Sequence, residues 1–156
     1  MKQKIYVETT IPSFFYETRP EPDMVARREW TNVWWKEYRE KYILVTSMAV
    51  VDELSKGNFP NKNQCLDFIK DIPILPITTE ITDIVQFYIQ HKAMPKDVLG
   101  DALHLALASF YKCDFLLTWN CKNLANANKF TQIRRLNGVL GIFVPILTTP
   151  LELIGD

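Results

Sequence analysis

The stretch VLGDALHLALASFYKCDFLLTWN, residues 98 to 120, contains the pattern that decides the fold. Its first part, residues 98–112, predicts a helix. Its second part, residues 114–119, is a short apolar run that predicts a buried strand. A helix that leads directly into a buried strand is typical of α/β domains, in which helices cover a parallel sheet.

Outward from this stretch, predicted strands and helices alternate along the chain. Strands are predicted at 5–7, 42–47, 73–77, 114–119 and 144–150. Helices are predicted at about 24–40, 49–57, 61–71, 80–92, 98–112 and 128–137, after a short helical turn at Pro12. Ser47 is the expected N-cap of the helix that Gly57 ends. We therefore predict a single domain over residues 1–156, a three-layer α/β/α fold around a central parallel sheet of about five strands.

The composition is that of an ordinary globular protein. Hydrophobic residues make up 47% and charged residues 23% of the 156 residues, and Lys+Arg and Asp+Glu number 18 each. The chain therefore has no net charge to draw it to nucleic acid or to an anionic membrane, although a local basic patch is compatible with this balance. No apolar stretch approaches the roughly 20 residues of a membrane helix.

The N-terminus and the cysteines indicate a cytoplasmic protein. Met1 leads straight into a strand, without a charged and apolar signal segment. Cys65, Cys113 and Cys121 form no C-x-x-C pair, and with two histidines they make no zinc set of familiar spacing. An odd and sparse set of cysteines is typical of reduced thiols. We therefore expect a soluble, intracellular protein.

Oxygen-bearing side chains fall where the predicted strands end. Glu8 ends the first strand, and Asn120 directly follows the fourth. Glu53 lies in the helix after the second strand, and Asp101 near the start of the helix before the fourth. Sites in such sheets form beyond the carboxyl ends of the strands, so these side chains are expected to meet there. Clustered carboxylates repel one another unless a cation compensates, and an oxygen-rich cluster suits Mg²⁺ or Mn²⁺.

Each of these residues also has a purely structural interpretation. Glu53 is either a site residue or a surface residue of an amphipathic helix. Asp101 is either a ligand or a first-turn acid that the helix dipole favours. Asn120 and Asn123 either face the site or only shape the turn after the strand. The placement of the residues together is what favours a site.

Two further polar residues share the predicted helix of Asp101. His104 follows three residues later on the same face, from which it can touch the site. With leucines around it, a packed and hydrogen-bonded histidine is the favoured role. Asp97, four residues before Asp101, is expected to be a helix N-cap rather than a ligand.

Three segments together resemble the PIN-domain family, the fold of many bacterial toxin ribonucleases of the VapC type. They are IYVETTIPS (5–13), VTSMAVVDELSKG (45–57) and GDALHLALASFYKCDFLLTWNCKNL (100–124). Family members typically have a strand-ending Asp followed by Thr or Ser, a helical Glu, a helix that opens with D-A-L/I, and T-x-D/N after the fourth strand. These positions fall on Glu8, Glu53, Asp101 and Asn120. The resemblance covers nearly the full chain, and its last segment is the most specific.

The resemblance implies a metal-dependent ribonuclease. In this interpretation Glu8 and Asp101 bind one or two Mg²⁺ or Mn²⁺ ions directly. Asn120 supplies a neutral carbonyl oxygen, and Glu53 acts through a water. The ions activate water for in-line attack on an RNA phosphodiester and neutralise the charge that develops at phosphorus and the leaving oxygen.

The resemblance also implies supporting residues and partners. Thr9 and Thr118 are expected to orient the acids by hydrogen bonds. The expected partners are an RNA substrate, a second copy of the chain in a homodimer, and a small antitoxin protein that neutralises the toxin. No membrane partner is expected.

Two departures from the family pattern keep an alternative function open. Glu8 is one methylene longer than the usual Asp, which shifts either the backbone or the ion by about 1.5 Å. Asn120 removes a negative charge that Asn123 does not restore. Weaker metal binding follows, so the alternative is a PIN-like scaffold with weak or no catalysis that binds RNA or a protein partner.

The residues that contact a substrate are harder to identify from the sequence. Trp30, Trp34 and Tyr38 form an aromatic stripe that either stacks on bases or, as is commoner, packs in the core or a dimer face. Basic residues around this helix and in a second group either contact phosphates or form a solvated helix face; they are Arg27, Arg28, Lys36, Arg39 and Lys41, and Lys129, Arg134 and Arg135.

Other α/β functions lack their motifs. The segment VETTIPS after the first strand contains no glycine, which argues against a dinucleotide site. Neither G-x-x-x-x-G-K-[ST] nor G-x-S-x-G is present. A phosphatase with an aspartyl nucleophile would have Asp where this chain has Glu8.

Overall fold

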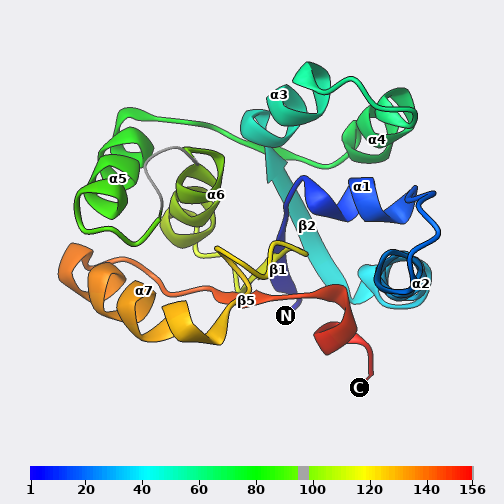
Figure 1. Cartoon of the computed structure of the whole chain (residues 1–156). Coiled ribbons are helices and arrows are strands. Elements are labelled where there is room, and N and C mark those ends of the chain that lie inside the picture. Colours follow the sequence, from blue (N-terminus) through cyan, green and yellow to red (C-terminus); the bar gives the residue numbers. More distant parts are fainter. Residues whose placement is uncertain (95–98, 156) are drawn as a thin grey trace.

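A computed structural model describes residues 1–94 and 99–155, and its architecture is the predicted one (Figure 1). Helices cover both faces of one parallel sheet, so the prediction of a three-layer α/β/α fold with five strands is confirmed. The expected N-cap Asp97 lies outside the described residues.

The sheet has the strand order β3-β2-β1-β4-β5, and every neighbouring pair is parallel. The strands are β1 (Gln3–Val7), β2 (Tyr42–Ser47), β3 (Ile74–Leu75), β4 (Phe115–Leu117) and β5 (Ile146–Thr148). The chain builds outward from β1 to one side and then returns to build the other side. Such a reversal is a topological switch point, where a crevice opens beyond the carboxyl ends of the two central strands. Here it lies beyond β1 and β4, whose last residues Val7 and Leu117 are in register.

Helices connect the strands and form the outer layers. They are α1 (Thr10–Phe15), α2 (Pro22–Glu37), α3 (Met48–Lys56), α4 (Lys62–Ile69), α5 (Thr79–Gln90), α6 (Leu99–Phe110) and α7 (Ala127–Leu140), with short 3₁₀ helices η1 (Arg39–Lys41) and η2 (Pro150–Leu153). Helices α5, α6 and α7 lie on one side of the strands, and α1 and α2 lie on the other (Figure 1). Helix α3 lies beyond the end of β2 (Figure 1).

Some local details differ from the predictions. Strand β3 is only two residues long, because Pro73 and Pro76 on either side have no N–H to donate to a neighbouring strand. Ser47 occupies the N-cap position of α3, but its side chain does not cap the helix. The Ser47 hydroxyl instead lies 2.7 Å from the Tyr6 hydroxyl, and this contact becomes part of the site.

The aromatic stripe of α2 packs into the core and braces the end of β4. Trp34 is fully buried, at 0% exposed, which confirms the packing interpretation at this position. Trp30 stacks on Trp119, with ring centroids 6.0 Å apart. The indole N–H of Trp119 donates to the Thr31 hydroxyl at 2.8 Å. Helix α2 therefore holds the segment that directly follows β4.

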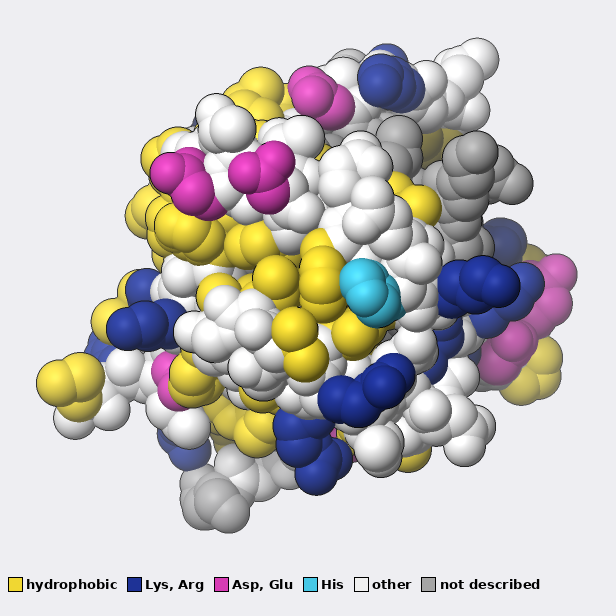
Figure 2. All heavy atoms as spheres, turned by 90° about the vertical axis from the view of Figure 1, so that its left-hand side faces the viewer, with side chains coloured by type: hydrophobic (Ala, Val, Ile, Leu, Met, Phe, Trp, Pro, Cys, Tyr) yellow, Lys and Arg dark blue, Asp and Glu magenta, His cyan; other side chains and the backbone are white. Residues whose placement is uncertain are grey.

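Figure 2 shows the side of the molecule on which α5 and α7 lie in Figure 1. Hydrophobic side chains gather in the middle of this face, and Lys and Arg side chains lie near them (Figure 2). In helix α7, the arginines Arg134 and Arg135 are exposed.

Among the helices of residues 1–94 and 99–155, none is both long enough and apolar enough to cross a membrane.

Candidate metal centre

Glu8 continues β1 into the crevice beyond the sheet. The residue is buried, with 3% exposed. Its Oε1 accepts hydrogen bonds from the Thr10 hydroxyl at 2.5 Å, the Thr10 backbone N–H at 3.2 Å and the Thr118 hydroxyl at 2.6 Å. Its Oε2 accepts no hydrogen bond from the described residues and lies 4.0 Å from His104 Nε2. One carboxylate oxygen is thus held in place, and the other is available to a ligand.

Hydrogen bonds join the segments after β1 and β4 at the site itself. The Glu8 N–H donates to the Leu117 carbonyl at 3.2 Å. The Trp119 N–H donates to the Thr10 hydroxyl at 2.7 Å, and the Asn120 N–H donates to the Thr118 hydroxyl at 2.9 Å. The two threonine hydroxyls therefore position Glu8 and the turn after β4 together.

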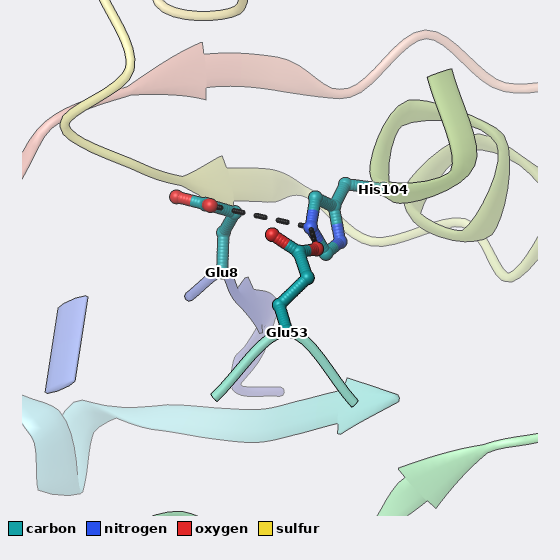
Figure 3. Close-up of side chains that lie close together, drawn as sticks. All are labelled: Glu8, Glu53 and His104. Atoms are coloured by element: carbon teal, nitrogen blue, oxygen red, sulfur yellow. Dashed lines mark hydrogen bonds and ion pairs between the residues drawn. The ribbon is translucent and has the colours of Figure 1, made fainter. Parts of the chain in front are cut away.

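Glu53 from α3 and His104 from α6 meet beside Glu8 (Figure 3). His104 is fully buried, and its Nε2 lies 2.5 Å from Glu53 Oε1. The Glu53 side chain is 40% exposed, so it forms the side of the cluster that faces solvent. A Cβ at Gly100 would lie 3.1 Å from Glu53 Oε1, so the glycine makes room for this carboxylate. Potential ligand atoms of Glu8, Glu53 and His104 all lie within 4.8 Å of one another.

A buried hydrogen-bond chain orients the His104 ring from behind. The Tyr6 hydroxyl lies 2.7 Å from His104 Nδ1 and 2.7 Å from Ser47 Oγ. All three residues are fully buried. Because a hydroxyl can both donate and accept, Tyr6 fits either tautomer of the imidazole, with Ser47 as the second partner.

Asp101 forms a second, adjacent cluster with two asparagines. It is buried, with 6% exposed. Its Oδ1 accepts from Asn120 Nδ2 at 3.0 Å, and its Oδ2 accepts from Asn123 Nδ2 at 3.1 Å. The Asn120 Oδ1 accepts the Asn123 backbone N–H at 3.1 Å. Amide groups therefore satisfy both oxygens of this carboxylate.

The electrostatics of the two clusters disfavour negative charge. Burial raises the pKa of the Glu8 carboxyl above its usual range, and His104 and the hydroxyl donors offset this only in part. Burial likewise raises the pKa of Asp101. Burial alone would lower the pKa of His104, but the hydrogen bond to Glu53 and the nearby carboxylates raise it overall. A cation at this place would relieve the cost of the buried charges.

The donor set of the first cluster fits a divalent ion. Two ligands of one ion lie at most about 4.4 Å apart when each bond is about 2.2 Å long. The observed limit of 4.8 Å for Glu8, Glu53 and His104 is close to this value. Two carboxylates and one imidazole are ligands that Mn²⁺ and related ions accept, and the nitrogen makes the set less suited to Mg²⁺.

The structure divides the predicted site residues between the two clusters. It places Glu8 and Glu53 with His104, and it places Asp101 with Asn120. Direct binding of an ion by Asp101 and Asn120 stays a prediction. In the observed arrangement the Asn120 carbonyl oxygen accepts a hydrogen bond from the Asn123 backbone N–H.

The supporting threonines are Thr118 and Thr10. Thr118 donates to Glu8, as expected of it. The hydroxyl of Thr9 is buried without a partner among the described residues, and Thr10 makes the contact that we expected of Thr9. The reason is the turn into α1, which brings the Thr10 N–H and hydroxyl back to Glu8 Oε1.

Two comparisons with known proteins add no assignment. No protein-family model matches the chain. A search of curated proteins finds no significant match.

Proposed function

We propose that this protein is a metal-dependent ribonuclease with a PIN-like fold, which hydrolyses RNA phosphodiesters. The single observation that carries the proposal is the approach of Glu8, Glu53 and His104 to within 4.8 Å at the switch point of a parallel sheet. The buried charge of Asp101 acts on the same place, since it contributes to the raised pKa of His104.

In this proposal Glu8 Oε2, a Glu53 oxygen and His104 Nε2 hold an Mg²⁺ or Mn²⁺ ion. When bound, such an ion supplies activation of water and neutralisation of charge on the phosphate. The imidazole nitrogen favours Mn²⁺ over Mg²⁺. Thr10 and Thr118 fix Glu8, and Tyr6 fixes His104 by accepting from its Nδ1–H while Ser47 accepts from the Tyr6 hydroxyl.

Hydrolysis forms a bond from the water oxygen to phosphorus and breaks the bond from phosphorus to the leaving oxygen, which gains a proton. Among the three cluster residues, Glu53 is the exposed one, so RNA approaches from its side. Its carboxylate is the group placed to take the proton that water loses.

The test is incubation of the purified protein with mixed RNA in Mn²⁺, in Mg²⁺ and in chelator. Glu8→Gln preserves the shape and the acceptor at Oε1, so it should fold normally and lose cleavage. Glu37→Gln removes an exposed carboxylate of α2 and should cut like the parent. Cleavage that is equally fast in chelator would refute the metal-dependent mechanism.

A specific observation favours a second candidate, a PIN-like scaffold with weak or no catalysis. Both oxygens of Asp101 are satisfied by the amides of Asn120 and Asn123, so an ion gains less there than from a free carboxylate. Such a scaffold would bind RNA or a protein partner in the same way with metal and with chelator. RNA binding without cleavage under both conditions would favour it over the nuclease.

We propose in addition that the nuclease is the toxin of a toxin–antitoxin pair, acting in the cytoplasm as a homodimer. The three cysteines are free thiols, which suits a reducing compartment. Expression should arrest growth, and co-expression of the neighbouring small open reading frame should restore it. Light scattering of the purified protein measures whether it is a dimer.

A further inference from the structure

A cavity of about 430 Å³ adjoins the candidate metal centre. Glu53 lines it, and so does Thr9, the residue after Glu8. Other parts of the wall come from the end of α1 with the loop that follows, including Tyr16, and from the segment between α3 and α4, including Phe59. A ligand in this cavity would therefore lie beside the carboxylates of the centre.

The wall includes two aromatic rings. Tyr16 and Phe59 are both half-buried, so their rings are accessible from the cavity. The Phe59 ring packs against Gly57, where an added Cβ would lie 2.6 Å from a ring carbon. Apolar walls with a few polar groups are typical of sites for small ligands. Any nucleobase can stack on such rings, because every base has a π-face.

The charges of the lining favour a neutral ligand over a phosphate group. Arg19 donates from Nε and Nη2 to the two carboxylate oxygens of Glu17, at 2.7 and 2.9 Å. Glu53 adds a further negative charge that this pair does not balance. Thr9 lines the cavity, and its hydroxyl is buried without a hydrogen-bond partner within the described residues, so a rotation about χ1 would present an unpaired hydroxyl to a ligand.

We propose that this cavity binds one unpaired nucleobase of the RNA substrate, next to the phosphodiester that is cut. The inference rests on the proposed ribonuclease function and makes its substrate class specific. The base stacks on Phe59 and presents its polar edge to Thr9, while the neighbouring phosphate lies at the metal centre. Single strands and loops offer bases in this way, and intact duplexes do not.

The test is the binding of fluorescein-labelled single-stranded hexanucleotides of A, C, G or U, measured by anisotropy in chelator, where the proposed cleavage does not proceed. Phe59→Ala should weaken binding of the preferred oligonucleotide about five- to one-hundredfold and reduce the preference among bases. Phe59→Leu keeps an apolar side chain without a π-face and should weaken binding in the same direction. Phe143→Ala, which removes a ring outside the cavity, should bind like the parent.

The outcomes separate this inference from the function on which it rests. Unchanged binding by folded Phe59→Ala and Phe59→Leu, with metal-dependent cleavage by the parent, overturns the base site and leaves the nuclease. Binding that depends on Phe59 without cleavage in Mn²⁺ or Mg²⁺ supports the base site and overturns the nuclease. A parent that binds none of the four oligonucleotides overturns the base site. Thermal melts of each variant identify loss of fold.

Discussion

The candidate site has two adjacent halves that satisfy their carboxylates in different ways. In the histidine half (Glu8, Glu53 and His104), Glu8 Oε2 has no hydrogen-bond donor among the described residues. In the amide half (Asp101, Asn120 and Asn123), both oxygens of the acid accept from amide groups. Asp101 and His104 are one turn apart on α6, so the halves belong to one electrostatic environment.

The difference shows that a bound cation can stabilise two buried carboxylates of one site to different extents. An amide donor stabilises a buried carboxylate without adding charge, and so it does part of what an ion would do. In the histidine half, all three hydrogen bonds that the Glu8 carboxylate accepts from the described residues go to its Oε1, which leaves Oε2 without a donor among them, and three potential ligand atoms come together. Substitutions in the two halves should therefore have different consequences for metal binding.

The largest effect is expected from Glu8→Gln. It removes a direct ligand and should lower Mn²⁺ affinity by more than the roughly 10- to 100-fold typical of residues behind the ligands. Asp101→Asn removes a charge from the amide half and should stay within that roughly 10- to 100-fold range. Calorimetric titration with Mn²⁺ compares the two variants directly.

The control for these titrations is Glu37→Gln, which removes an exposed carboxylate from α2 and should leave Mn²⁺ affinity unchanged. Equal losses in Glu8→Gln and Asp101→Asn would break the comparison. Both acids would then be direct ligands, as the sequence predicts, and binding of the ion would have to rearrange the amide half.

The next largest effect is expected from Tyr6→Phe, which removes the hydroxyl behind His104. It should cost about 10- to 100-fold in Mn²⁺ affinity, because a ligating histidine needs a partner at its other nitrogen. It should also cost about 1–3 kcal/mol of unfolding free energy, since His104 Nδ1 and Ser47 stay buried without this partner.

Tyr88→Phe is the matched control for Tyr6→Phe. Tyr88 is fully buried, and its hydroxyl donates to Asn137 Oδ1 at 2.6 Å, away from the clusters. Its loss should lower stability by a similar amount and leave Mn²⁺ affinity unchanged. If both tyrosine variants bind Mn²⁺ like the parent, the Tyr6 hydroxyl has only a structural role.

The fold could be predicted because its determinants are local. Apolar runs at 42–47 and 114–119, separated by helices, imply parallel strands, and the structure has strands there. The third strand is shorter than the predicted 73–77, because its length depends on pairing with β2 between two prolines. Such pairing is a tertiary property that local pattern does not contain.

The site could be predicted only in part, because its geometry depends on side-chain direction. The positions of Glu8 and Glu53 followed from the end of the first predicted strand and from the helix after the second. The prediction of a packed and hydrogen-bonded His104 is confirmed, but its place beside Glu8 and Glu53 did not follow from its spacing to Asp101. The spacing could not show that Tyr6, from a buried strand, would hold the ring toward two carboxylates.

A smaller effect on stability and Mn²⁺ affinity is expected from Asn120→Asp, which places a second carboxylate next to that of Asp101. The Asn120 amide donates to Asp101 Oδ1 at 3.0 Å, and an aspartate would replace that donor by a like charge. The metal-free variant should lose about 1.5–3 kcal/mol of unfolding free energy, as for a lost hydrogen bond to a charged group. Mn²⁺ affinity should rise, because the added carboxylate attracts the ion. The rise should be only roughly tenfold, because repulsion between the acids and their desolvation offset part of this attraction.

Asn63→Asp adds the same charge on an exposed position of α4 and should change neither quantity. Apo melts and Mn²⁺ titrations of the two variants measure the effect. If metal-free Asn120→Asp has the melting temperature and the Mn²⁺ affinity of the parent, the charge of the amide half does not affect ion binding. Asn120 then only stabilises the turn after β4.

The smallest effect is expected from pH, and it concerns the metal-free protein. The folded-state pKa of Glu8 and Asp101 is raised by burial, and that of His104 is raised by Glu53 and the other carboxylates despite burial. Between the unfolded and the folded pKa, the folded protein therefore holds protons that the unfolded chain has released. The free energy of unfolding then falls as pH rises. The window begins near pH 4 for the acids and near pH 6.5 for the histidine, their approximate unfolded values.

Glu17 changes the stability with pH in the opposite direction. Its hydrogen bonds with Arg19 lower its folded-state pKa, so the stability that they contribute is lost as pH falls. The difference between parent and Glu8→Gln isolates Glu8 from such groups. Urea unfolding in chelator, at several values between about pH 4 and pH 8, should show the parent losing stability relative to Glu8→Gln as pH rises. Saturating Mn²⁺ should reverse this trend, because the ion binds the ionised carboxylate of the parent and stabilises the folded state. A difference that stays constant with pH, with and without Mn²⁺, would mean that Glu8 ionises as easily in the folded protein as in the unfolded chain, and the contrast between the two halves would then have no electrostatic basis.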